Sequence, residues 1–159
     1  MLYVKRDKIA KIWPLFAAEE KNKADIRKFE EVGTHSAAPR LAIGEAMLFH
    51  NGVGGKRKEA RLRHLQRHWT TQVRSVPNIV LNTPGDAKRS CAIANVGIAG
   101  LRPADLAKTL LDRYKVWTVA IDNAAAGVHG VRVTPQLFTT PAELDVLVKA
   151  LKELSSRGA

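Results

Sequence analysis

The order of short apolar runs and proline-opened helices over residues 77–159 constrains the fold of this chain more than any other feature. Four runs predict strands: NIVLNT (78–83), CAIANVGI (91–98), VWTVAI (116–121) and GVRVT (130–134). Proline at a first helical position predicts helices that begin at Pro103 and Pro141, and Thr140 with Glu143 adds a capping box to the second. The order β-β-α-β-β-α predicts a compact α+β lobe, with helices on one face of a mostly antiparallel sheet, in a chain that is α/β overall.

The residues before this lobe predict one short strand and two further helices. MLYVK (1–5) has the composition of a strand, whereas residues 39–50 form a helix that is apolar nearly all round, as is typical of a helix buried in a larger body or at an interface. After a glycine-rich break, an apolar stripe predicts an amphipathic helix over 56–75, and this stripe consists of Leu62, Leu65, Trp69 and Val73. We therefore divide the chain into residues 1–50, a connecting basic helix over 51–76, and a small domain over 77–159.

The net charge of +11, from 26 basic and 15 acidic residues, is concentrated in that helix. Residues 56–74 carry seven Lys or Arg side chains and a single acid, Glu59. A basic face of this kind is usually solvated, although it also suits an acidic partner or a nucleic acid. Trp69 falls on the apolar side of the helix, and no aromatic platform for stacking bases accompanies the charges, which favours the solvated face.

Several other classes of protein and site are disfavoured. The single cysteine, Cys91, excludes an internal disulfide framework and a cysteine-rich zinc site, and indicates a reducing, cytoplasmic setting. Apolar runs fall short of the roughly 20 residues that a membrane-spanning helix needs, so we expect no membrane span. His64 and His68 share a helix face at a metal-compatible spacing, but a third ligand is not evident nearby, so we predict no metal site.

Two positions could bind an anion. Gly33 and Thr34 lie in a small-residue loop just before the helix at 39–50, where a hydroxyl and backbone N–H groups could hold one. Arg132 lies in the run GVRVT, and strand alternation turns it to the face opposite Val131 and Val133. An arginine in that position either faces water at a sheet edge or offers a fixed fork to a carboxylate, and the pattern alone does not separate the two.

Two blocks, FEEVGTHSAAPRLAIGEAM (29–47) and GVRVTPQLFTTPAELDVLVKAL (130–151), resemble the class V aminotransferase family of enzymes that use pyridoxal phosphate (PLP). Its members similar to isopenicillin-N epimerase and to selenocysteine lyase are the nearest in pattern, and the resemblance covers nearly the whole chain. It implies that residues 1–50 correspond to the end of the PLP-binding large domain and residues 77–159 to the C-terminal small domain. The family's Schiff-base lysine would precede residue 1.

The resemblance also assigns roles to the two anion-binding positions. Thr34 matches the threonine that contacts the cofactor phosphate across the dimer interface, and Arg132 matches the arginine that binds the substrate carboxylate. Cysteine desulfurases of the family carry a nucleophilic cysteine ahead of that arginine, but residues 122–129 contain none here. We expect the C-terminal portion of an aminotransferase, epimerase or lyase acting on an amino acid, in a homodimer or with an N-terminal PLP domain.

In this isolated chain we expect no catalytic residue, no bound PLP and no activity. The alternative is a non-catalytic binding or assembly module that uses the basic helix 56–75.

Overall fold

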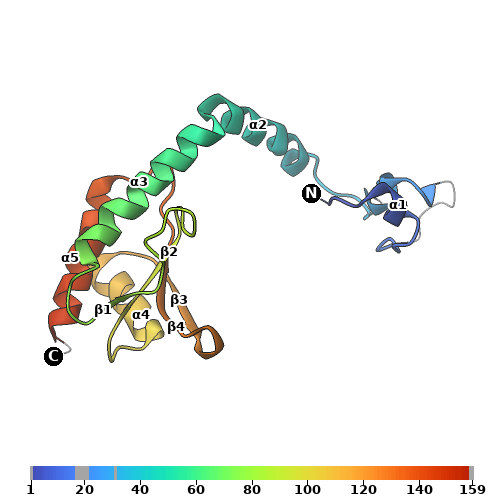
Figure 1. Ribbon diagram of the computed structural model, residues 1–159. Helices are drawn as coiled ribbons and strands as arrows, with labels where there is room; N and C mark the ends of the chain where they lie inside the picture. The colour runs from blue at the N-terminus through green and yellow to red at the C-terminus, as the bar shows by residue number, and fades with distance from the viewer. Residues whose placement is uncertain (1, 17–21, 31, 158–159) are drawn as a thin grey trace. The chain divides into compact units, whose positions relative to one another are not determined.

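The chain divides into two compact units, Met1–Phe49 and His50–Ala159. The computed structural model describes residues 2–16, 22–30 and 32–157 (Figure 1). The second unit is built on a sheet of four strands, and its order is β1-β2-β4-β3 with every neighbouring pair antiparallel. The strands are β1 (Ile79–Leu81), β2 (Ala94–Ile98), β3 (Val119–Asn123) and β4 (Val128–Val133). The predicted order and the antiparallel sheet are thus confirmed.

Two of the helices begin where proline predicts. Helix α4 spans Pro103–Tyr114 and helix α5 spans Pro141–Arg157. The capping box of α5 is formed: the backbone N–H of Thr140 donates to Glu143 Oε2 at 2.7 Å, and the N–H of Glu143 donates to Thr140 Oγ1 at 3.3 Å. Both bonds satisfy backbone donors that the first helical turn leaves free, which explains why sequence alone locates this helix.

Helix α3 (Gly55–Val73) contributes to the same hydrophobic core as the sheet. Its side chains Leu65, Trp69 and Val73 are fully buried, as the predicted apolar stripe requires. They pack with alternate residues of the strands, among them Val96 and Val131. The strands therefore bury one face, and α3, α4 and α5 lie together on that side of the sheet (Figure 1).

The first unit contains little regular structure before helix α2 (Ala38–Val53), most of which belongs to it. The strand predicted over residues 1–5 is wrong where the structure describes it: residues 2–5 form no strand, and a short helix, α1 (Arg6–Ile9), follows them. A strand needs a partner to satisfy its backbone groups, and the sheet's four strands all lie in the second unit.

Lys28 organises this first unit. It lies in a 3-10 helix (Ile26–Glu30), is buried to all but 3 % of its surface, and donates from Nζ to the carbonyl oxygens of Ile9 and Lys23. Two carbonyl acceptors offset part of the cost of removing the ammonium group from water. The buried amine thus joins α1 to the segment that leads towards α2.

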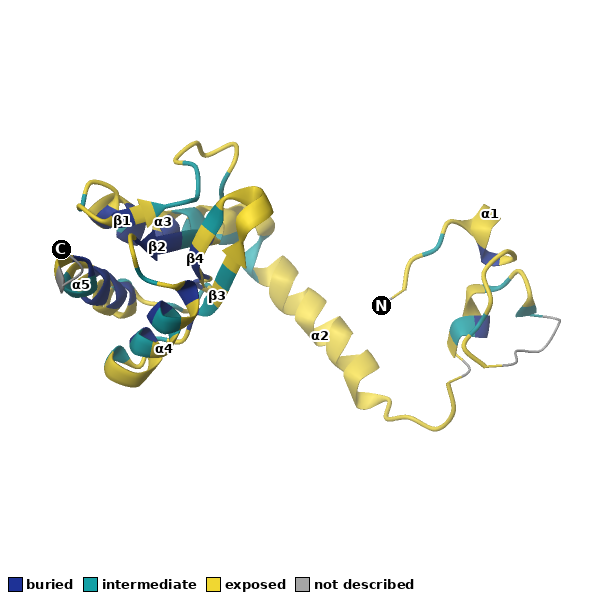
Figure 2. Cartoon of the chain, turned by 90° about the horizontal axis from the view of Figure 1, so that it is seen from below, coloured by how far each residue is buried: buried dark blue, intermediate teal, exposed yellow. Residues whose placement is uncertain are grey.

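Helix α2 is present as predicted, but none of its residues is buried (Figure 2). Leu41, Leu48 and Phe49 are each more than 60 % exposed. An apolar helix with every side exposed is typical of an element that another body covers. That the chain's residues 1–50 derive from a larger domain stays a prediction.

Candidate functional site

Arg132 lies on an inner strand of the sheet, which removes one of its two alternatives. β4 pairs with β2 on one side and with β3 on the other, so Arg132 stands opposite Asn95 and opposite Val119. The sheet-edge alternative is therefore wrong, and the fork for a carboxylate is the one that stays open. The expected alternation is confirmed, because Arg132 is exposed between the buried residues Val131 and Val133. Its guanidinium therefore projects from the sheet face opposite the helices.

The backbone that carries Arg132 is held on both sides, whereas its side chain is free. No other described residue forms a hydrogen bond or an ion pair with its guanidinium. An arginine normally directs five N–H donors in a planar fork, which matches the two oxygens of a carboxylate. A rigid strand position with an unpaired fork is the arrangement expected for an anion ligand.

A pair of asparagines lies beside Arg132, and sequence reasoning missed it. Asn82 Nδ2 donates to Asn95 Oδ1 at 2.7 Å and to the carbonyl oxygen of His129 at 3.1 Å. The pair therefore links the segment after β1 to β2 and to β4. One signal was present in the sequence: a polar residue, Asn95, interrupts the apolar run CAIANVGI at a position that faces away from the core.

Thr34, the other predicted anion-binding residue, lies in the first unit, in the loop before α2. The loop turns at Gly33, whose φ of 81° lies in the left-handed region, and His35 Nδ1 contacts the carbonyl oxygen of Gly33 at 2.9 Å. The Thr34 side chain is exposed and forms no hydrogen bond with another described residue. Thr34 and Arg132 belong to different units, so each is characterised within its own.

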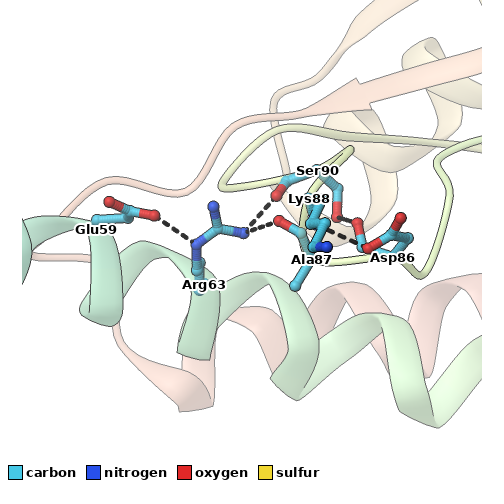
Figure 3. Close-up of polar contacts among 6 residues, drawn as sticks. All are labelled: Glu59, Arg63, Asp86, Ala87, Lys88 and Ser90. Atoms are coloured by element: carbon cyan, nitrogen blue, oxygen red, sulfur yellow. Dashed lines mark hydrogen bonds and ion pairs between the residues drawn. The ribbon is translucent and has the colours of Figure 1, made fainter.

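Two arginines of the basic helix bind loops of the second unit. Arg63 donates from Nη1 to the carbonyl oxygens of Ala87 and Ser90, at 2.7 and 2.5 Å, and from Nε to Glu59 (Figure 3). Arg61 donates to the carbonyl oxygen of Thr139 at 2.9 Å. Part of the basic excess that sequence reasoning assigned to a solvated face therefore holds loops in place.

The histidine pair of the same helix is also engaged within the chain. His68 Nε2 lies 2.7 Å from Asp145 Oδ1 of α5, and this hydrogen bond holds the pKa of the Asp145 carboxyl below its ordinary value. The His64 and His68 rings are tilted, with centroids 6.4 Å apart. Among the described residues, no three His, Cys, Asp or Glu side chains gather in a way that could hold a metal ion.

The paired strands β3 and β4 carry a second histidine–carboxylate contact, between Asp122 and the residue opposite it, His129. His129 Nδ1 lies 2.6 Å from Asp122 Oδ1, and both side chains are more than half exposed. Cys91 is half-buried and free. Within the described part of the chain, no helix is long and apolar enough to cross a membrane.

Comparison with known proteins gives one curated relative and several solved structures. No family model matches the sequence. Isopenicillin N epimerase from Amycolatopsis lactamdurans is 28 % identical over 131 residues, which are 82 % of this chain and 32 % of that protein. The chain thus spans about a third of the length of this relative.

The solved structures share the fold at low identity. The cystine C-S lyase C-DES, in a K223A mutant with glycine linked to its PLP cofactor, matches with a TM-score of 0.72 and 17 % identity, over 95 % of this chain and 40 % of that one. The cysteine desulfurase of Thermococcus onnurineus matches with a TM-score of 0.68 and 16 % identity, over 82 % of this chain and 34 % of that one. The cysteine desulfurase CsdA of Escherichia coli matches with a TM-score of 0.67 and 20 % identity, over 80 % of this chain and 32 % of that one.

Proposed function

We propose that the chain is the C-terminal portion of a PLP-dependent enzyme that acts on an amino acid. It has the fold of the C-terminal domain of fold-type I PLP enzymes, a group that includes class V aminotransferases and cysteine desulfurases. The observation that carries this proposal is Arg132. It is an exposed, unpaired arginine on an inner strand, and such a fork binds and orients a carboxylate through two parallel hydrogen bonds.

The residues of this chain fit two anionic groups of such a site. The exposed hydroxyl of Thr34 can donate to the cofactor phosphate, and Arg132 can bind the carboxylate of the amino acid. When bound, PLP supplies an electron sink for negative charge that develops on the substrate. This chain's part is then to hold the substrate by its carboxylate, so that its α-carbon takes one orientation. No catalytic residue is assigned to it.

The proposal includes a partner. Helix α2 exposes Leu41, Leu48 and Phe49 directly after the Thr34 loop, and an N-terminal PLP domain or a second copy of the chain would cover this surface. Without that partner, the isolated chain would bind no PLP covalently. Incubation with PLP, borohydride treatment and intact-mass analysis tests this: we expect no defined attachment. Stoichiometric attachment at one lysine would show instead that the chain holds its own cofactor lysine.

The role of Arg132 is tested with a simple carboxylate. Titration of the ¹⁵N-labelled chain with acetate, at an ionic strength held constant with chloride, is expected to shift the Arg132 Nε–H signal saturably. Arg132→Leu is expected to abolish binding, whereas Arg89→Leu, which removes an exposed arginine of the loop after β1, is expected to leave it intact. Equal weakening by both variants would mean that acetate responds to net charge, and the carboxylate role of Arg132 would be lost.

A further inference from the structure

Asn95 stands beside Arg132 with almost all of its polar atoms already bound. Its backbone N–H donates to Thr83 Oγ1 at 2.8 Å, and its carbonyl oxygen accepts from the N–H of Asn82 at 3.0 Å. Its side-chain Oδ1 accepts from Asn82 Nδ2 at 2.7 Å. Three contacts thus fix both the backbone and the orientation of the amide.

The exception is the Nδ2 group of Asn95, which is buried and has no acceptor among the described residues. Buried donors in folded proteins are almost always paired, so an unpaired one requires an explanation. The amide cannot turn to find an acceptor without giving up the bond from Asn82. The donor is therefore held in place with its bonding capacity unused.

Gly130 makes room for this arrangement. A Cβ atom at Gly130 would lie 2.6 Å from Asn95 Oδ1 and would also overlap the carbonyl oxygen of Val96. Any other residue at this position would have to displace the Asn95 amide and the neighbouring backbone of β2. The absence of a side chain at Gly130 leaves room for the asparagine amide beside β4, the strand that also carries Arg132.

Asn95 and Arg132 are direct cross-strand neighbours, and residues in such a pair have Cβ atoms about 5 Å apart on the same face of a sheet. Two unsatisfied donors, one of them cationic, thus stand together. An ionised carboxylate has about four lone-pair sites, of which a guanidinium fork uses two. One carboxylate can therefore satisfy both residues.

We propose that Asn95 is a second binding residue for the carboxylate of the amino-acid substrate, donating from Nδ2 to an oxygen that Arg132 also holds, and that Asn82 positions it. The inference rests on the proposed function of Arg132. Because Nδ2 is shielded from water, the ligand reaches it when a neighbouring side chain moves. In this proposal the side chain that moves is Arg132, which is exposed, unpaired and directly opposite. The three contacts that hold Asn95 set the depth at which the carboxylate binds.

The acetate titration separates this inference from the function on which it rests. In the full chain we expect the side-chain NH₂ signals of Asn95 and the Nε–H of Arg132 to shift with the same Kd. Asn95→Leu is expected to raise that Kd about tenfold, the order that a hydrogen bond to a charged group represents. Thr134→Val, which removes a different polar group two residues from Arg132, is the matched control and is expected to leave the Kd unchanged.

Two further variants keep the test decisive if Asn95→Leu fails to fold. Asn82→Ala retains the Asn95 donor but removes the hydrogen bond that holds the Asn95 amide. A higher Kd is therefore expected, with smaller shifts of the Asn95 NH₂ signals. Asn95→Asp places a carboxylate opposite Arg132, where it is expected to occupy the guanidinium and exclude acetate. If Arg132→Leu abolishes binding while the Asn95 and Asn82 variants bind as tightly as the wild type, the role of Asn95 is overturned and that of Arg132 stands. If acetate shifts neither residue, both are overturned.

Discussion

Arg63 provides the sharpest test of how the basic helix serves the fold. Arg63→Ala removes two hydrogen bonds to the carbonyl oxygens of Ala87 and Ser90 and the ion pair with Glu59. A hydrogen bond to a charged group contributes roughly 1.5–3 kcal/mol when it is shielded. Here both bonds come from the same nitrogen, 26 % of the Arg63 side chain is exposed and water can replace it at the carbonyls, so the two bonds together contribute about 1–1.5 kcal/mol. The ion pair with Glu59 adds only about 0.3–0.5 kcal/mol.

The expected loss is therefore about 1–2 kcal/mol in the free energy of unfolding, or roughly 4–8 °C in Tm for a unit of this size. Urea denaturation followed by circular dichroism measures the first, and calorimetry measures the second. Amide hydrogen exchange should also show faster exchange confined to the loop that contains Ala87 and Ser90, because Arg63 is what ties that loop to α3.

Arg67→Ala is the matched control. Arg67 lies one turn further along the same helix and is exposed, and its guanidinium forms no hydrogen bond or ion pair with another described residue. Its removal therefore changes the net charge equally without breaking a loop contact. We expect it to alter the stability by less than about 0.5 kcal/mol. Equal effects of the two substitutions would refute the loop-holding role, because Arg63 would then contribute no more to stability than a solvated arginine.

Three further predictions concern the core, the cap of α5 and the basic surface. Trp69→Ala should destabilise the second unit by about 3–5 kcal/mol, measured by urea denaturation, because it empties a fully buried site; a loss below 1 kcal/mol would contradict the burial. Hydrogen bonds from Thr140 hold the pKa of the Glu143 carboxyl below its ordinary value of 4.5. A lowered pKa stabilises the folded state at pH values above 4.5, and this stabilisation is lost as the pH falls below 4.5. Glu143→Gln should therefore make stability fall less steeply with decreasing pH in the acid range. An unchanged dependence on pH would count against the cap. Fluorescence anisotropy with a DNA duplex at 150 mM salt should show no saturable binding by the basic helix, whereas a salt-dependent isotherm would favour the binding-module alternative.

Features that depend on neighbours in the chain were predictable. The capping box at Thr140 and Glu143, the start of α4 at Pro103 and the alternation around Arg132 all involve residues within about four positions of one another. Strand lengths were less predictable: the run NIVLNT yields a strand of only three residues, Ile79–Leu81. Its pairing with β2 stops at Leu81 and Val96, and the N–H of Asn95 donates to the Thr83 side chain instead of to backbone. The opening run, MLYVK, has strand composition, but its described residues, 2–5, pair with no strand.

Features that depend on distant residues required the tertiary structure. The amphipathic pattern of residues 56–75 predicted a basic outer face, yet whether an arginine there meets water or a carbonyl depends on where the loops at Ala87 and Thr139 return, and no local pattern contains that information.

By itself, the sequence determined the type and order of the elements in the lobe and the face on which Arg132 stands, because helix caps and strand alternation act over a few residues. Only the tertiary structure decided that β4 is an inner strand and that Asn95 faces Arg132 with a donor unused. The physical reason is that strand order and register join residues 37 positions apart, and the free energy that selects them comes from burying one face of the whole sheet under three helices.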